Sequence, residues 1–203
     1  LWSGKIFGLV APGYDMARLV ARQLVGDQAG EFIGADMSTK LKLLGVDVAS
    51  IGDAQGATPG SLNYLFSDEV AGHYKKLVVS ADRKTLLGAV LVGEAEDYGT
   101  LLQMALNGIP LPEHPEDLIL PARQGAAPKG LGVDLLPASA SICSCNNVSK
   151  GDLCAAISGG AASLGALKKC TKAATSCGGC QPLVKQVLDA ELKKAGVTVF
   201  NHL

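Results

Sequence analysis

The residues of this 203-residue chain that could do chemistry are its six cysteines, which all lie between positions 143 and 180. Four of them form two close pairs, Cys143-Ser-Cys145 and Cys177-Gly-Gly-Cys180, with 31 residues between the pairs. A metal centre needs several thiolates that converge on one small volume, and each short-spaced pair delivers two of them from a single loop. The spacing therefore predicts a metal centre held by Cys143, Cys145, Cys177 and Cys180.

The sequence that flanks each cysteine pair indicates a helix start. Ser149 lies three residues before Asp152, a spacing typical of a capping box, and Pro182 fits the first turn of a helix that runs to Gly196. Free backbone N–H groups at helix starts stabilise thiolates, and hydrogen bonds to cluster sulfurs raise a reduction potential. The two glycines of the second pair would let the backbone approach a cluster closely. These features favour a [2Fe-2S] cluster.

Other interpretations of the cysteines are weaker, but they remain open from the residues alone. Disulfides are disfavoured in a cytosolic chain, and a thioredoxin-like role for the second pair lacks βαβ surroundings and leaves the first pair idle. A zinc site has the right ligands, although zinc modules usually leave two to four residues between both cysteine pairs. We expect Cys154 and Cys170, which lie in helix-like segments, to be buried and inert.

The composition is that of an ordinary globular protein. Hydrophobic residues make up 48% of the chain, charged residues 18%, and the net charge is -1, so no general basic field would attract nucleic acid. No apolar run approaches the roughly 20 residues that span a bilayer, and the first residues do not resemble a signal peptide. We expect no nucleic-acid or membrane partner and a cytoplasmic location. Since residue 1 is Leu rather than Met, we also expect a piece of a longer polypeptide.

The elements ahead of the cysteines are predicted to form an antiparallel sheet with helices. An amphipathic helix is expected over 15–25, capped by Asp15 and stopped by Gly26, and a second helix is expected through 101–106 and ending at Gly108. Five short β-rich runs lie between them, and the last two read as an antiparallel hairpin. The five runs are 41–44, 46–51, 62–66, 74–81 and 85–92.

A change of character near residue 139 predicts a boundary between two folded parts. Residues 109–138 hold six prolines and little periodicity apart from a possible helical turn at 116–120, which indicates a linker. Residues 1–142 carry a net charge of -5, whereas residues 143–203 carry +4. The predicted fold class is α+β: an antiparallel-sheet domain with helices, followed by a small, mainly helical [2Fe-2S] module.

Two stretches of the chain resemble known families. The run Cys143–Asp152, followed by Cys177-Gly-Gly-Cys180-Gln-Pro-Leu-Val184, resembles the [2Fe-2S] domain related to bacterioferritin-associated ferredoxin (BFD). Residues 34–53, with 84–93 and 117–121, resemble the large subunit of bacterial NAD(P)H-dependent assimilatory nitrite reductases. One local departure is Ala-Ala-Thr-Ser at 173–176, where Ala-Gly-Thr-Gly is expected.

The resemblance implies a place within a larger oxidoreductase. Residues 1–29 would be the terminal helix of an FAD-binding domain, 30–121 the α+β C-terminal domain of rubredoxin-reductase-like flavoproteins, 122–138 a linker, and 139–203 the BFD-like [2Fe-2S] domain. In such a parent, NAD(P)H reduces FAD, the [2Fe-2S] cluster takes electrons singly, and a sirohaem centre, with its [4Fe-4S] cluster, reduces nitrite to ammonium. The chain contains no dinucleotide fingerprint and no further cysteine cluster.

The same resemblance implies binding partners and leaves two alternative functions open. The expected partners are the FAD and sirohaem domains of the same parent chain and a possible small subunit, and no catalytic residue is assigned within this segment. The nearer rival is the electron-transfer subunit of an assimilatory nitrate reductase. The rival from another class is a non-redox binding module whose cysteines hold zinc.

Overall fold

The structure is a computed structural model that describes residues 4, 6–27, 30–121, 132–143, 146–176 and 178–196. The chain divides into two compact units, Leu1–Ser38 and Thr39–Leu203. Each unit is described by itself.

The first unit contains one helix, α1 (Val10–Leu24), which begins five residues earlier than the sequence pattern predicts. The prediction that Asp15 caps this helix is wrong, because Asp15 lies within it and accepts a hydrogen bond from Arg18 at 2.9 Å. Pro12 does not prevent the early start, since a proline in the first turn needs no intrahelical partner for its nitrogen. Gly26, at φ +79°, takes the left-handed conformation that was expected of it just after the helix.

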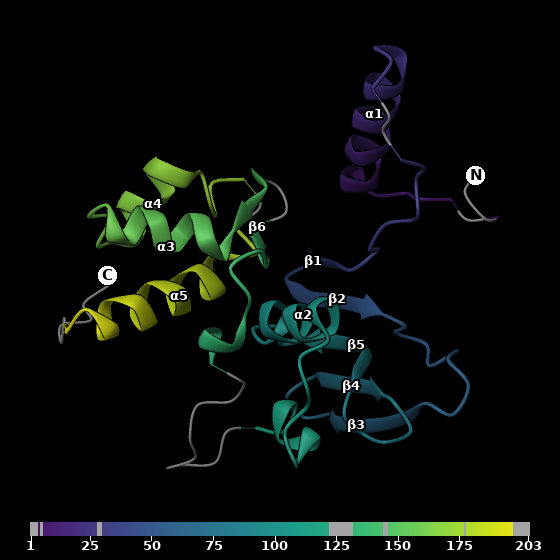
Figure 1. The fold of residues 1–203 in the computed structure, drawn as a ribbon. Coiled ribbons are helices and arrows are strands. Elements are labelled where there is room, and N and C mark those ends of the chain that lie inside the picture. The colour runs from purple at the N-terminus through teal and green to yellow at the C-terminus, as the bar shows by residue number, and fades with distance from the viewer. Residues whose placement is uncertain are drawn as a thin grey trace. The chain divides into compact units, whose positions relative to one another are not determined.

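The second unit begins with a five-stranded antiparallel sheet in the order β1-β2-β5-β4-β3 (Figure 1). The predicted strands and the predicted hairpin between β4 and β5 are therefore confirmed, with small changes at their ends. The strands are β1 (Thr39–Leu43), β2 (Val46–Gly52), β3 (Leu62–Asp68), β4 (His73–Val79) and β5 (Leu86–Gly93).

One face of this sheet is covered by the helix α2 (Tyr98–Asn107). Leu101 and Met104 of α2 are buried with apolar side chains from the three central strands, such as Ile51 and Leu77. The helix ends, as predicted, at Gly108, whose φ of +59° is left-handed and whose N–H donates to the Met104 carbonyl. A helix on an antiparallel sheet confirms the α+β class.

A lysine is also buried on the inner face of the sheet, where the alternating pattern would suggest an apolar side chain. The ammonium group of Lys75 is paired with Glu94 and lies 3.6 Å from Asp97. Burial raises the pKa of Glu94, but the hydrogen bond and charge of Lys75 outweigh it and lower the pKa overall. These residues and His73 line a pocket of about 330 Å³. The ion pairs account for the burial, since a buried charge needs a partner.

The chain then leads to the cysteines through short elements. The 3-10 helix η1 (Pro115–Leu118) lies where a helical turn was predicted, and η2 (Val133–Leu135) precedes the small hairpin of β6 (Ser141–Cys143) and β7 (Val148–Ser149). Residues 122–131 of the predicted linker lie outside the described residues.

Three helices complete the second unit: α3 (Lys150–Ser158), α4 (Leu164–Thr171) and α5 (Gln181–Lys194). The predicted capping box at α3 is present, because the Asp152 N–H donates to Ser149 Oγ at 3.1 Å while the Asp152 carboxylate accepts from the Ser149 N–H at 2.9 Å. Pro182 lies in the first turn of α5, as predicted. The helices enclose buried Leu153, Leu167 and Leu188.

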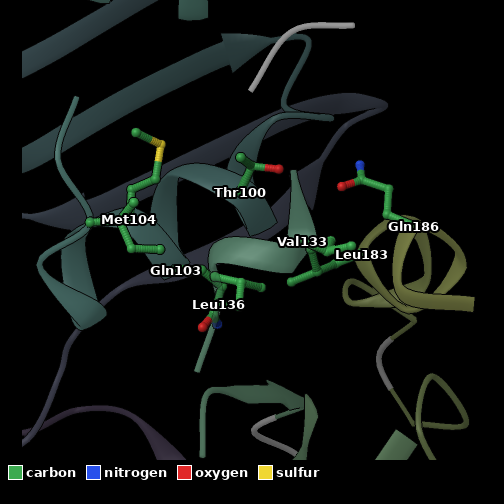
Figure 2. A pocket seen from close by; sticks show the side chains of 8 residues that line it. Thr100, Gln103, Met104, Val133, Leu136, Leu183 and Gln186 are labelled. Carbon is green, nitrogen blue, oxygen red and sulfur yellow. The ribbon is translucent and has the colours of Figure 1, made fainter. Parts of the chain in front are cut away.

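The helical part and the sheet meet along an apolar seam formed by Met104, Val133, Leu136 and Leu183 (Figure 2). Figure 2 shows Leu183 and Gln186 coming from α5 toward α2, with η2 beside them. The void in the seam measures about 10 Å³, which is at most the size of one water and too small for a ligand.

A partly buried hydrogen bond lies at one end of this seam. The side-chain amide of Gln103 on α2 donates to the carbonyl of Ser141 on β6 at 2.6 Å, and its oxygen accepts from Asn107 at 2.9 Å. The helix α2 is thereby attached to the strand that carries Cys143. Within the part of the chain that the structure describes, no helix has the length and apolar character to cross a membrane.

Candidate metal centre

The structure brings together one cysteine from each predicted pair. Cys143 is the last residue of β6 and is 2% exposed, whereas Cys180 immediately precedes α5 and is partly exposed. A hydrogen bond from Cys180 reaches the sulfur of Cys143. The other two expected ligands, Cys145 and Cys177, lie outside the described residues.

Left-handed residues shape both loops that carry the cysteines. Asn147, at φ +51°, turns the chain between β6 and β7, and Lys172, at φ +65°, ends α4. Ala174 has a φ of +58°, a conformation that an alanine adopts at a steric cost and a glycine adopts freely. Position 174 is one of the two at which a glycine was expected, so the geometry explains that expectation.

Backbone N–H groups converge on the Cys143 sulfur. Burial raises the pKa of Cys143, but hydrogen bonds from the backbone of Ala174 and Asn146, and from the side chains of Cys180 and Asn146, lower it overall. Donors around a sulfur stabilise the thiolate, which is the form that binds metals. The surroundings of the Cys143 sulfur thus favour its thiolate form, in which it could bind a metal.

Asn146 was missed as a functional candidate from sequence. Its side-chain amide lies 3.7 Å from the Cys143 sulfur and reaches three groups of the second cysteine loop. An amide placed directly after a cysteine pair is the one signal that could have suggested it, because such a side chain is short enough to stay beside the ligands.

The remaining cysteines behave differently from each other. Cys154 on α3 is partly buried, and burial, followed by the charge of Glu191, raises the pKa of its thiol. Cys170, on the last turn of α4, is exposed, so the prediction that it is buried is wrong. Leu167, one turn earlier in α4, is the buried residue of this helix, whereas Cys170 lies at its exposed end.

The donor set fits a four-cysteine cluster as far as it is described. Cys143 and Cys180 are in contact, and backbone N–H groups of Ala174 and Asn146 donate to the sulfur of Cys143. The described residues contain no group of three or more His, Cys, Asp or Glu side chains able to hold a metal, and two of the four expected ligands fall outside them. His114 is exposed beside Glu116.

Two family models match the two parts of the second unit. Residues 38–108, which hold the sheet and α2, match the rubredoxin NAD+ reductase C-terminal domain. Residues 141–190, which hold both cysteine pairs, match the BFD-like [2Fe-2S] binding domain.

Similarity to longer proteins extends over the whole chain. It is 64% identical, over 98% of its length, to the nitrite reductase [NAD(P)H] large subunit of Klebsiella oxytoca, and 58% identical, over all of its length, to the nitrite reductase (NADH) large subunit of Escherichia coli. It is 34% identical, over 92% of its length, to the assimilatory nitrate reductase electron transfer subunit of Bacillus subtilis. The chain spans 21%, 24% and 23% of these three relatives, respectively.

Proposed function

Because this chain is homologous along its length to a segment of the nitrite reductase large subunits, we propose that it is the electron-transfer segment of such an enzyme. Electrons from FAD would pass through its [2Fe-2S] centre toward a sirohaem centre that reduces nitrite to ammonium. The observation that carries the proposal is the contact of Cys143 with Cys180, one cysteine from each pair, inside a BFD-like domain.

Cys143, Cys145, Cys177 and Cys180 would hold the cluster. A bound [2Fe-2S] cluster supplies one-electron chemistry between a two-electron donor and its acceptor. The chain's own part is to bury Cys143 away from water and to direct N–H groups at its sulfur. The start of α5 at Cys180 adds the positive end of a helix, which also stabilises a thiolate.

The rival functions have less support. Identity to the nitrate reductase subunit is 34%, against 58% and 64% to the two nitrite reductase subunits. These identities favour the proposal in which nitrite is the final electron acceptor. The match to a [2Fe-2S] binding domain and the tight Cys-x-Cys spacing favour iron over zinc.

In the proposed domain order, the FAD-binding domain that would donate electrons comes before the cluster domain in the chain. We assign residues 1–29 to an FAD-binding domain, 30–121 to the reductase C-terminal domain, 122–138 to a linker and 139–203 to the cluster domain. Exposed apolar side chains on α1, such as Leu24 and Val10, would suit a helix that packs against another domain. The expected partners are the FAD and sirohaem domains, with a possible small subunit, in the cytoplasm; this segment alone is not expected to turn over substrate.

Anaerobic reconstitution with iron and sulfide tests the proposal. The chain should take up two irons and two sulfides and absorb in the visible, which a zinc protein does not do. Cys177→Ser and Cys143→Ser should abolish uptake, because each removes one of four ligands. Cys154→Ser is the matched control and should load fully. Full iron retention by the Cys177 variant would contradict the ligand assignment.

A further inference from the structure

Asn146 connects the two loops that carry the cysteines. Its side-chain nitrogen lies 2.8 Å from the Lys172 carbonyl and 3.1 Å from the Ser176 hydroxyl, and its oxygen lies 3.3 Å from the same hydroxyl. The residues that it joins are 26 and 30 positions away in sequence. One side chain therefore sets the separation of the loops.

The same amide also faces the sulfur of Cys143, at 3.7 Å. An amide nitrogen has two hydrogens, whereas four acceptors lie within its reach, so these hydrogens must be shared. The Lys172 carbonyl does not depend on Asn146, since the Thr175 hydroxyl also donates to it, at 2.7 Å. An amide hydrogen can therefore turn to a charged sulfur, a stronger acceptor than a hydroxyl, while the Lys172 carbonyl keeps a donor.

We propose that Asn146 is a positioning residue of the [2Fe-2S] site, which holds the two cysteine loops at their working separation and stabilises charge on the Cys143 sulfur. The inference rests on the proposed function, because it assumes that these cysteines bind a cluster. A hydrogen bond to a ligand sulfur stabilises the more negative, reduced cluster, so it raises the reduction potential.

The shape and chemistry of asparagine suit both tasks. A serine at position 146 would be too short to reach the far loop while it faces the sulfur. An aspartate would keep the length but lose both donors and place a negative charge beside the Cys143 thiolate. A glutamine keeps the donor on a stem that is one methylene longer.

The test compares reconstituted wild-type chain with Asn146→Leu, Asn146→Asp and Asn146→Gln. We expect the Leu and Asp variants to have a more negative reduction potential, an altered visible circular dichroism spectrum and at least tenfold faster loss of iron to a chelator. The Gln variant should lie between them and the wild type. Asn63→Leu, at an exposed position of strand β3, is the control and should change none of these properties.

The outcomes separate this inference from the proposed function. A wild-type chain that binds no iron would overturn both. A loaded wild-type chain together with an Asn146→Leu variant of the same potential and iron-loss rate would overturn the positioning role alone. If Asn146→Leu keeps the wild-type far-ultraviolet spectrum but cannot be loaded, that loss supports the role, and the Gln variant then provides the measurement of potential.

Discussion

At the scale of single residues, Ala174 is held in a conformation that its side chain does not favour. Its φ is +58°, in a loop whose backbone N–H is directed at Cys143. Ala174→Gly should stabilise the chain by up to about 0.5 kcal/mol, because removal of the Cβ strain exceeds the added entropy of the unfolded glycine and the loss of a buried methyl group. Urea unfolding of the cluster-free chain measures this.

The matched control for that substitution is the neighbouring Ala173, which is fully buried and is not among the residues with positive φ. Ala173→Gly should destabilise the chain, because it removes a buried methyl group and gains no relief of strain. Equal effects of the two glycines would show that the conformation at position 174 stores no strain.

Sequence patterns predicted the starts of α3 and α5, but not the polar side chains that are buried in the interior. Spacing and cap chemistry are local, so Ser149, Asp152 and Pro182 could be assigned their positions in advance. Lys75 and Gln103 are buried because distant residues offer them partners, and no local pattern contains that information. The prediction that Cys170 is buried is wrong because the local pattern does not say which side of α4 the rest of the chain covers.

At the scale of secondary-structure elements, the sheet followed from alternation and turn residues, whereas its strand order did not. The hairpin of β4 and β5 is local, but the insertion of β5 between β2 and β4 depends on contacts far apart in sequence. The expected start of α1 at Asp15 is five residues too late, because a proline such as Pro12 is tolerated in the first turn of a helix.

Gln103 is the element-scale link that can be tested. Gln103→Leu should destabilise the chain by about 1 kcal/mol, because it removes the hydrogen bonds that the buried Gln103 amide makes with the Ser141 carbonyl and the Asn107 side chain. Gln186→Leu lies on the same seam but is exposed, so it should change stability by less than about 0.5 kcal/mol. Urea midpoints at unchanged slope provide the comparison, and similar shifts in both variants would count against the role of the hydrogen bond.

At the scale of the whole molecule, the cluster should act as a folding ligand for residues 139–196. A module of some 60 residues buries too little apolar surface to be secure, and metal binding adds directly to its folding free energy. Hydrogen exchange of the amides at 146–149 and 173–176 should therefore slow greatly once iron is bound. The amides of β2, β4 and β5 should be unaffected and serve as the control. Equal protection of the two loops with and without iron would show that the module folds without its cluster.

The apolar seam has a consequence for the way electrons could travel. Some redox domains are joined to their protein by a flexible linker and move between an electron donor and an electron acceptor. Here, a swing of the helical part away from α2 would expose Met104, Leu136 and Leu183 to water and break the Gln103 hydrogen bond two residues before Cys143. Under the proposed function, such a centre would stay in a fixed position, and the rate of electron transfer would depend on how closely the donor and the acceptor approach it.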